Sequence, residues 1–433
     1  GVARSDFGHC LFDRWSNRDF AFSKRAVFIA KCVGHGLGHF CGGIVGAVVT
    51  KRLFLTAGLV MAAVLMVGSG SALASTESDP PTAAPCAGVI GVIAPYGAGQ
   101  ANSTVQLNWA RVALDQFNKD NGTSFTISPA NVGSTEVDRG VVEAQRLATD
   151  EKIIGVVGPS SSLVTKSVGP VLDAAGLSYV SPSATATVLT EGSLSNFFRV
   201  VANDSVQGPS IAQFIESSLK PKKVLVVVDD EPYSIGLAKG VVRTLKAKGV
   251  KVSTTKITLK QKDMSSVAKA VTPSTNVLVL PILLPEDGVN IVNAVRDSGK
   301  FPAIVAGDSM FSLTEFNVPG AYVSSFAPDV SITPQGKDTI KLYGQIFDDL
   351  APYGGPAYVA MEVVLTAARK TCVNGSTTRA KVTKALPDVR LDSSILGQPL
   401  AFDANHDVVD GVFWVYRHAA DSFQPMTRAR VDK

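Results

Sequence analysis

The sequence predicts an α/β protein of two doubly wound lobes, each a parallel β-sheet with helices on both faces. Short apolar, β-rich runs alternate with helical patterns through residues 89–201, and this alternation is typical of parallel sheets with right-handed crossovers. The same alternation starts again at residue 205. A chain of 433 residues, 45 % hydrophobic and 18 % charged, is long and apolar enough to bury two such cores.

The first series of runs predicts the first lobe. Residues 153–157 are apolar throughout and indicate a buried strand, and Gly176 is the expected C-cap of the helix that follows it. The expected strands are 89–94, 125–127, 153–157, 179–181 and 197–201, and the expected helices are 102–118, 136–149 and 163–175.

The second series predicts the second lobe, and later elements predict a chain that crosses between the lobes more than once. We therefore expect the first lobe to comprise residues 88–204 and 328–408, and the second lobe residues 205–327 and 409–425. The expected strands of the second series are 224–228, 250–256, 277–280 and 304–306, and its expected helices are 205–218, 234–248, 263–270 and 288–298. The later elements are helices 335–350 and 357–370 and a final pair of strands, 399–402 and 412–416.

Residues 49–74 have the layout of a signal peptide. Lys51 and Arg52 precede an uncharged run over 53–67, and Ala72-Leu73-Ala74 forms a small-x-small cleavage site. These fifteen residues are fewer than the ~20 that span a bilayer, and no cysteine directly follows them as a lipidation site needs. We expect cleavage after Ala74, a linker over 75–87 and a non-lipidated protein in the periplasm or cell envelope. Residues 1–48 are expected to be a disordered upstream segment that natural translation leaves out.

The charge balance argues against a nucleic-acid partner. Residues 1–74 hold eight of the 41 basic side chains and three of the 37 acidic ones, so the remainder holds 33 basic and 34 acidic side chains. The basicity of the chain therefore belongs to the leader, and the folded part has no positive excess to attract phosphates.

Two cysteines, Cys86 and Cys372, remain after the expected cleavage. Cys86 precedes the first expected strand, and Cys372 follows the expected helix 357–370. An exported chain meets oxidising conditions, so the pair is a candidate disulfide. The sequence leaves open whether the two are bonded.

Two hydroxyl-rich turns follow expected strands of the first lobe. One contains Ser160, Ser161 and Ser162, and the other is Ser181-Pro182-Ser183-Ala184-Thr185. Ligands of open α/β sheets bind at the carboxyl ends of strands, where helix N-termini present free N–H groups. Ser and Thr also cap helices without any ligand, but two such turns, together with acidic and aromatic side chains elsewhere, favour a wall that binds a carboxylate.

Two other motifs are similar to known functional signatures. Gly97-x-Gly99-x-x-Asn102 lacks the third glycine of a dinucleotide fingerprint and has no ribose-binding acid after the second strand, so we expect no nucleotide cofactor. We also expect no metal. Gly307-Asp308-Ser309 with Asp403-x-x-His406 resembles the GDS-type serine esterases, and an esterase using Ser309, Asp403 and His406 is the alternative from another class.

The chain resembles the type I periplasmic binding proteins, specifically the branched-chain amino-acid (Leu/Ile/Val) binding family of ABC importers, from about residue 89 to 424. The resemblance implies two lobes joined by a three-crossover hinge, a ligand held between them, no catalysis, and ABC permease subunits in the membrane as partners. It rests on the order of several stretches: 156–162, 181–185, 203–208, 232–238, 307–309, 353–358 and 400–403.

The resemblance also implies roles for single residues. Ser162 and Thr185 would donate hydroxyls to a ligand carboxylate, and the Ala184 carbonyl and the Asp308 carboxylate would accept from its ammonium. Tyr233 would cover the ligand. The expected ligand-binding set is completed by Ser183, Leu283, Leu284 and Tyr96.

The resemblance has two departures that affect the ligand side chain. Leu283 and Leu284 stand where family members often carry tyrosines, and the first loop lacks an aromatic, for which Tyr96 and Phe311 are candidate replacements. We therefore expect an aliphatic or other amphipathic amino acid as the ligand. The alternatives within the same fold are an amide, a urea-like molecule, an aromatic acid, or a sensor role.

Overall fold

The computed structural model describes residues 84–96, 104–347 and 353–429. The expected upstream segment 1–48, the signal peptide 49–74 and most of the linker 75–87 lie outside the described residues. Within the described ranges, no helix is both long enough and apolar enough to cross a membrane.

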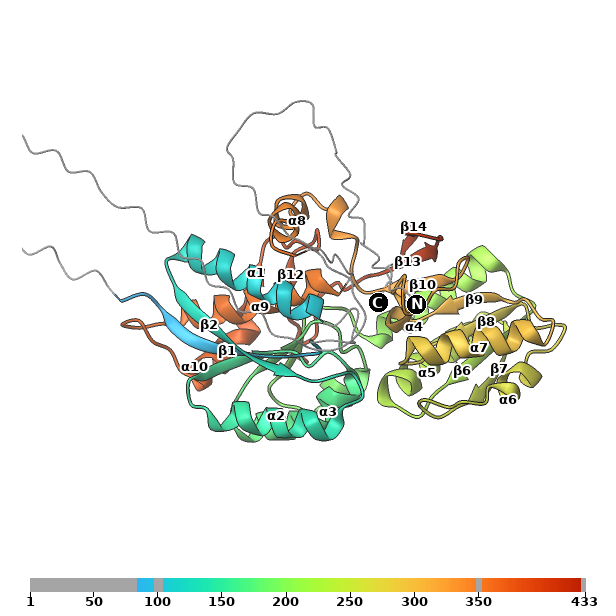
Figure 1. The fold of residues 1–433 in the computed structure, drawn as a ribbon, viewed down its shortest axis with the longest axis horizontal. Coiled ribbons are helices and arrows are strands. Elements are labelled where there is room, and N and C mark those ends of the chain that lie inside the picture. The colour runs from blue at the N-terminus through green and yellow to red at the C-terminus, as the bar shows by residue number, and fades with distance from the viewer. Residues whose placement is uncertain (1–83, 97–103, 348–352, 430–433) are drawn as a thin grey trace, which may run out of the picture. The chain divides into compact units, whose positions relative to one another are not determined.

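The first sheet has five strands, all parallel, in the order β2-β1-β3-β4-β5. Alternate side chains of β1 enter two different cores: Ile90 and Val92 pack toward α1 and α9, whereas Ile93 packs toward α2 and α3. Figure 1 shows these helices on the two faces of the sheet. The strands are β1 (Ala87–Ala94), β2 (Ser124–Asn131), β3 (Ile153–Val157), β4 (Tyr179–Ser181) and β5 (Phe197–Arg199), and the helices are α1 (Thr104–Asn121), α2 (Val137–Thr149), α3 (Ser162–Ala174) and α9 (Gly354–Lys370).

The second sheet repeats this order and then extends it. The parallel strands run β7-β6-β8-β9-β10, and β13 and β14 continue the sheet in antiparallel pairing. The prediction of two doubly wound sheets is confirmed, and the antiparallel extension is an addition to it. The strands are β6 (Lys223–Val228), β7 (Lys251–Lys256), β8 (Val277–Leu280), β9 (Ala303–Ala306), β10 (Tyr322–Ser325), β13 (Phe413–His418) and β14 (Phe423–Ala429).

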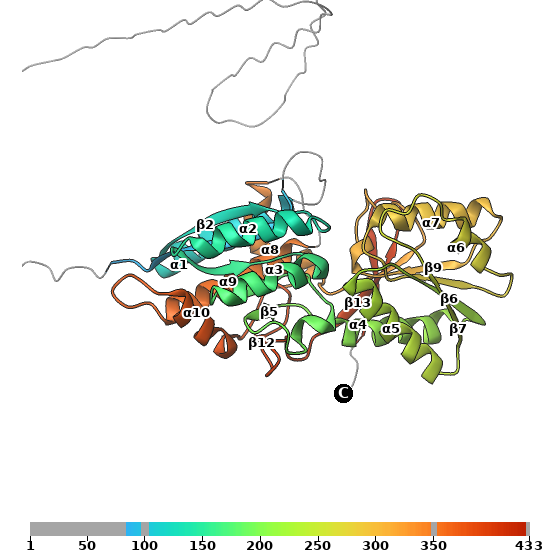
Figure 2. The same ribbon diagram turned by 90° about the horizontal axis from the view of Figure 1, so that it is seen from below.

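Helices cover both faces of the second sheet as well. Val224 and Val226 of β6 pack on the side of α4 and α5, and Leu225 and Val227 pack on the side of α6 and α7. Figure 2 shows the sheet between these two pairs of helices. Their bounds are α4 (Asp204–Phe214), which a π-turn η2 (Ile215–Leu219) continues, α5 (Pro232–Ala247), α6 (Ser265–Ala270) and α7 (Pro285–Asp297).

The late elements divide between the two sheets. Helix α8 covers Gly336–Gly344, so it ends before the expected residue 350, and α9 packs against α1 of the first lobe. The expected strands 399–402 and 412–416 are present as β12 (Leu400–Ala401) and β13, but they belong to different sheets. Strand β12 pairs with β11 (Arg390–Leu391), and β13 pairs with β10 and β14. The remaining short helices are α10 (Arg379–Ala385), η1 (Thr187–Thr190), η3 (Asp308–Met310), η4 (Val330–Ile332) and η5 (Leu386–Asp388).

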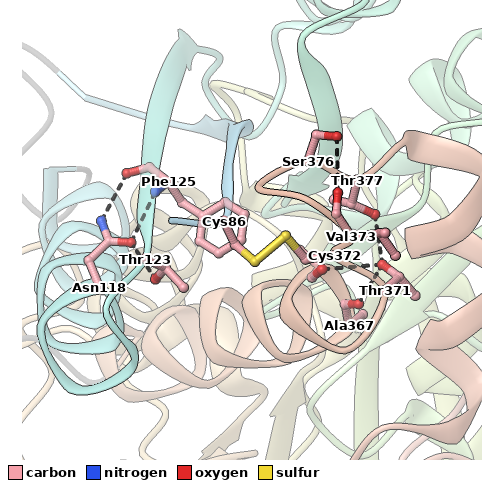
Figure 3. The surroundings of a disulfide bond; sticks show 11 residues. Cys86, Asn118, Thr123, Phe125, Ala367, Thr371, Cys372, Val373, Ser376 and Thr377 are labelled. Carbon is pink, nitrogen blue, oxygen red and sulfur yellow. Dashed lines mark hydrogen bonds between the residues drawn. A yellow bond between two sulfur atoms is a disulfide. The ribbon is translucent and has the colours of Figure 1, made fainter. Parts of the chain in front are cut away.

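A disulfide ties the start of the first sheet to the end of α9. The Sγ atoms of Cys86 and Cys372 are bonded, with the Cα atoms 6.0 Å apart (Figure 3). Beyond Cys372 the chain turns back, and Ala87 N donates to Gly375 O at 3.0 Å. The first strand is therefore anchored to the α9 end of its lobe by a covalent bond and a hydrogen bond.

Both sheets reverse their strand order at one place. The reversal lies between β1 and β3 in the first sheet, and between β6 and β8 in the second. The carboxyl ends of strands at such a switch point form the usual crevice for ligands in α/β sheets. The loops after these strands are therefore where a functional site is expected.

Candidate functional site

A cavity of about 670 Å³ is lined by loops that follow strands of both sheets. On the first sheet these loops follow β1, β2, β3 and β4, and on the second they follow β6, β7, β8 and β9. The lining residues are Pro95, Gln106, Gly133, Ser134, Thr135, Glu136, Ser160, Ser161, Ser162, Ser183, Tyr233, Lys260, Leu283, Leu284, Pro285, Glu286, Asp308, Ser309, Glu315 and Tyr353.

The first-sheet wall is a hydrogen-bonded group of serines at the start of α3. Ser161 caps the helix, because its Oγ accepts from Val164 N at 3.2 Å. Ser183 Oγ donates to Ser160 O at 2.7 Å and accepts from Gln106 Nε2 at 3.2 Å, and Ser160 Oγ donates to Gln106 Oε1. Hydroxyls beside a helix N-terminus suit an anionic group. We call Ser160, Ser161, Ser162 and Ser183 the serine wall.

Gln106 belongs to the site and was not predicted. It lies on α1, is 5 % exposed and reaches both Ser160 and Ser183. A glutamine inside an amphipathic helix gives no sequence signal of its own. The only available hint was its place one turn after the start of a helix that follows β1, the strand at the switch point.

The structure does not bring Ala184 and Thr185 to the cavity. Both are fully buried and lie outside its lining. The Ala184 carbonyl, expected to face a ligand ammonium, accepts from Arg199 Nη1 at 2.9 Å. Arg199 is itself fully buried, so its guanidinium needs such acceptors, and it draws the carbonyl away from the cavity. Ser162 does line the cavity, but its Oγ accepts from Ala186 N at 3.1 Å.

The second-sheet wall holds a buried carboxylate, Asp308, at the end of β9. It is 5 % exposed, and its Oδ1 accepts from Gln207 Nε2 at 2.6 Å and from the Tyr233 hydroxyl at 3.0 Å. Burial raises the pKa of Asp308 to about 6, and the two hydrogen bonds partly offset this effect. Tyr353 donates its hydroxyl to the Asp308 carbonyl at 2.6 Å. Asp308 is the buried acid in this wall, and its carboxylate suits a cationic partner.

Two buried acids set the position of Tyr233 and Leu283. Glu231 caps α5 by accepting from Tyr233 N at 3.1 Å and Ser234 N at 2.9 Å, and Asp229 accepts from Leu283 N at 2.8 Å. Burial is the main cause that raises their pKa values, to about 7 for Glu231 and about 6 for Asp229. Both acids therefore act on the site through the loops that they hold.

Gly307 is required for the close approach of Tyr233. A Cβ atom at Gly307 would stand 2.1 Å from the Tyr233 hydroxyl oxygen. Any larger residue would push the tyrosine off Asp308. The glycine before Asp308 therefore serves the hydrogen bond between the two.

Neither candidate aromatic replacement lines the cavity. Pro95 lines it next to Tyr96, whose backbone N donates to Asn131 Oδ1 at 2.8 Å. Phe311 packs into the second core, stacked on Phe423 with ring centres 3.9 Å apart. The apolar part of the lining comes from Leu283, Leu284 and the two prolines, Pro95 and Pro285.

The esterase residues are not assembled into a catalytic group. Ser309 Oγ donates to Ile282 O at 2.6 Å, whereas the His406 ring stacks on Phe198 and its Nδ1 lies 3.1 Å from Phe197 O. Asp403 Oδ1 accepts from two backbone N–H groups of its own turn. In the described part of the chain, no hydrogen bond joins Ser309 to His406 or Asp403.

Known proteins are similar to this chain in sequence and in fold. A Leu/Ile/Val-binding protein homologue from Brucella melitensis is 27 % identical over 365 residues, which cover 82 % of this chain and 93 % of the relative. An amino acid binding protein from Pseudomonas aeruginosa is 30 % identical over 59 % of this chain and 71 % of its own. The crystal structure of the branched-chain amino acid substrate-binding protein LivJ from Streptococcus pneumoniae, in complex with isoleucine, superposes with a TM-score of 0.68 at 21 % identity, covering 79 % of this chain and 99 % of that one.

The family assignment rests on the length of the match. The family model of periplasmic binding proteins covers residues 89–422, which include both sheets up to β13 and every residue that lines the cavity. The chain therefore belongs to the periplasmic binding protein family.

Proposed function

We propose that this protein is an exported, non-catalytic substrate-binding protein of an ABC importer, and that it binds an aliphatic or other amphipathic amino acid. The relatives described as Leu/Ile/Val-binding and amino acid binding proteins support the ligand class. The observation that carries the proposal is the buried Asp308 carboxylate on one wall of the cavity whose other wall is the serine wall.

The two walls match the two charges of an amino acid. A zwitterion that enters a cavity loses its water, so each charge needs hydrogen bonds from the protein. Ser160, Ser161 and Ser183 donate their hydroxyl protons within the protein, so the Ser162 hydroxyl and the N–H groups at the start of α3 supply the donors for the carboxylate. Asp308 accepts from the ammonium. Leu283 and Leu284 contact an apolar side chain. An affinity near 1 μM, about −8 kcal/mol, is expected for such a site.

Export and the membrane partner are part of the same proposal. A signal peptide over residues 49–74, cleaved after Ala74, would deliver the chain outside the cytoplasm. ABC permease subunits would then recognise the ligand-bound protein, because closure of two domains around a ligand changes the surface that they present.

Calorimetry on Asp308→Asn tests the role of the carboxylate. Leucine, isoleucine or valine should bind the unchanged protein, and the variant should bind at least about 100-fold more weakly, because a buried ammonium loses its counter-charge. The exposed Asp230→Asn is the matched control and should bind normally. Equal affinity of Asp308→Asn and the unchanged protein would contradict the assignment.

The same measurement separates the ligand classes. 4-Methylpentanoate has the carboxylate and side chain of leucine but lacks the amine. It should bind far more weakly than leucine. If it binds as well as leucine, the ligand is a carboxylic acid without an amine, and Asp308 has another role.

A further inference from the structure

Asp204 is a buried carboxyl that the proposed ligand site leaves unused. It begins α4, the first helix after the first sheet, and is 1 % exposed. Neither Oδ1 nor Oδ2 makes a hydrogen bond within the described residues. An ionised carboxylate only accepts hydrogen bonds, so a charge at this position would be buried without the donors that it needs.

The backbone at the start of α4 offers Asp204 no free donor. Helix N-terminal N–H groups often lack partners and can stabilise an anion. Here the first four are all engaged with other acceptors: Asp204 N with Thr185 O at 2.9 Å, Ser205 N with Asn203 Oδ1 at 2.9 Å, and Val206 N and Gln207 N with Asn203 O at 2.9 and 3.2 Å.

The helix that packs on Asp204 brings no donor either. Helix α5 places Gly236 opposite it, and a Cβ atom there would stand 3.7 Å from Asp204 Oδ2. The hydroxyl of Tyr233, also on α5, donates to Asp308 instead.

The charged groups around Asp204 act mostly against its ionisation. Burial is the largest cause that raises the pKa of Asp204 well above the usual value, and the charges of Asp308 and Glu231 add to it. The nearby Thr185 hydroxyl, which makes no hydrogen bond of its own within the described residues, and the charge of Arg199 lower the pKa. Arg199 is the one cation among these groups. Its guanidinium donates to Asp407 Oδ1 at 2.5 Å, to the carbonyls of Ala184 and Ala186 at 2.9 Å each, and to Thr190 Oγ1 at 2.6 Å.

Gln207 lacks the donor that a neutral Asp204 would provide. Its Nε2 donates to Asp308 Oδ1 at 2.6 Å and to Ser324 Oγ at 2.8 Å, but its buried Oε1 has no hydrogen bond. Asp204 and Gln207 are three residues apart on α4, a spacing at which side chains are neighbours. An O–H group on Asp204 would satisfy Oε1 and hold the amide in this orientation.

We propose that Asp204 is a neutral carboxylic acid in the folded protein, and that its O–H donates to Gln207 Oε1 and keeps the Gln207 NH₂ on Asp308. Asp204 is then a positioning residue for the group that accepts the ligand ammonium. That role rests on the proposed function, whereas the neutral state of Asp204 does not.

The pH dependence of unfolding tests the neutral state without any ligand. The unfolded chain releases the Asp204 proton above pH 4, and the folded chain keeps it, so raising the pH favours unfolding. The measurement compares the unfolding equilibrium constants of the full-length unchanged protein and Asp204→Asn between pH 5 and 8. The constant of the unchanged protein should rise relative to that of Asp204→Asn by about tenfold for each pH unit.

Asp297→Asn, at an exposed position on α7, is the control. Its free energy of unfolding should differ from that of the unchanged protein by the same amount at every pH. A stability difference between Asp204→Asn and the unchanged protein that does not vary with pH would overturn the proposal. Infrared spectra at pH 7 give a second test that involves no unfolding. The spectrum of the unchanged protein minus the spectrum of Asp204→Asn should show the C=O band of a protonated carboxyl. The absence of this band would also overturn the proposal.

Leucine affinity at neutral pH tests the positioning role. Asp204→Asn keeps a donor for Gln207 Oε1 and should bind as the unchanged protein does, whereas Asp204→Leu has none and should bind roughly tenfold more weakly. Equal affinities of the two variants would overturn this role. If the unchanged protein binds no amino acid, the proposed function fails, and the unfolding measurement still decides the state of Asp204.

Discussion

If Asp308 accepts from the ligand ammonium as proposed, ligand affinity should depend on pH. Burial raises its pKa to about 6 in the ligand-free protein, and an adjacent ammonium would lower it, so protonation competes with binding. Leucine affinity should be nearly constant from pH 7 to 8 and should fall by up to about tenfold per unit below pH 6. Calorimetry across this range measures the effect, and an affinity that is unchanged between pH 5 and 8 would rule out Asp308 as the ammonium partner.

The sequence predicted residues whose signal is local and missed those whose role depends on packing. Ser162 and Asp308 follow strands directly, so their place in the cavity could be predicted from the strand pattern. Ala184 also follows a strand, but a buried arginine 15 residues later turns its carbonyl inward. Gln106 and Gln207 lie within helices and reach the two walls only through tertiary contacts.

The secondary structure elements also divide into those that a local sequence pattern predicts and those that depend on tertiary packing. Expected strands 153–157, 179–181 and 277–280 agree with β3, β4 and β8, because continuous apolar runs specify buried parallel strands. Strand β14 was missed, because five of its first six side chains are exposed and carry no alternating pattern. The partner of β12 also could not be predicted, since a two-residue strand has too little pattern to set its register.

The disulfide stabilises the fold by linking the start of β1 to the end of α9. It joins the residue before β1 to the second residue after α9, 286 positions apart, and so restricts the unfolded chain over most of the described residues. Replacing both cysteines by serine should lower the free energy of unfolding by about 2–4 kcal/mol. Denaturant titration of the double variant measures this loss.

Reduction provides the matched control for that variant. A reducing agent should destabilise the unchanged protein to the level of the double variant and should leave the double variant itself unaffected. Equal stability of the oxidised and reduced protein would show that Cys86 and Cys372 are not bonded in solution.

At the scale of the whole molecule, the two sheets share one strand order, and this symmetry explains the position of the site. The order 2-1-3-4-5 appears as β2-β1-β3-β4-β5 and again as β7-β6-β8-β9-β10. Each switch point contributes one wall: the serine wall lies beside it in the first sheet, and the loops held by Asp229 and Glu231 lie beside it in the second. The alternation of strands and helices predicted both sheets, but not the residues that meet across the cavity.

Several buried carboxyls together set how the stability of the ligand-free protein varies with pH. Burial raises the pKa of Asp229 and Asp308 to about 6 and that of Glu231 and Glu362 to about 7, above the usual values of 3.8 and 4.5. The folded state therefore binds more protons than the unfolded state between about pH 4 and 7, and stability falls as the pH rises through this range. The midpoint of thermal unfolding without ligand should be higher at pH 5 than at pH 7.5.

Saturating leucine should reverse part of this trend, because it binds the ionised Asp308 and adds stability mainly at pH 7.5. Scanning calorimetry at both values, with and without leucine, measures both effects, and a ligand-free midpoint that rises from pH 5 to 7.5 would contradict the buried, protonated state of these groups.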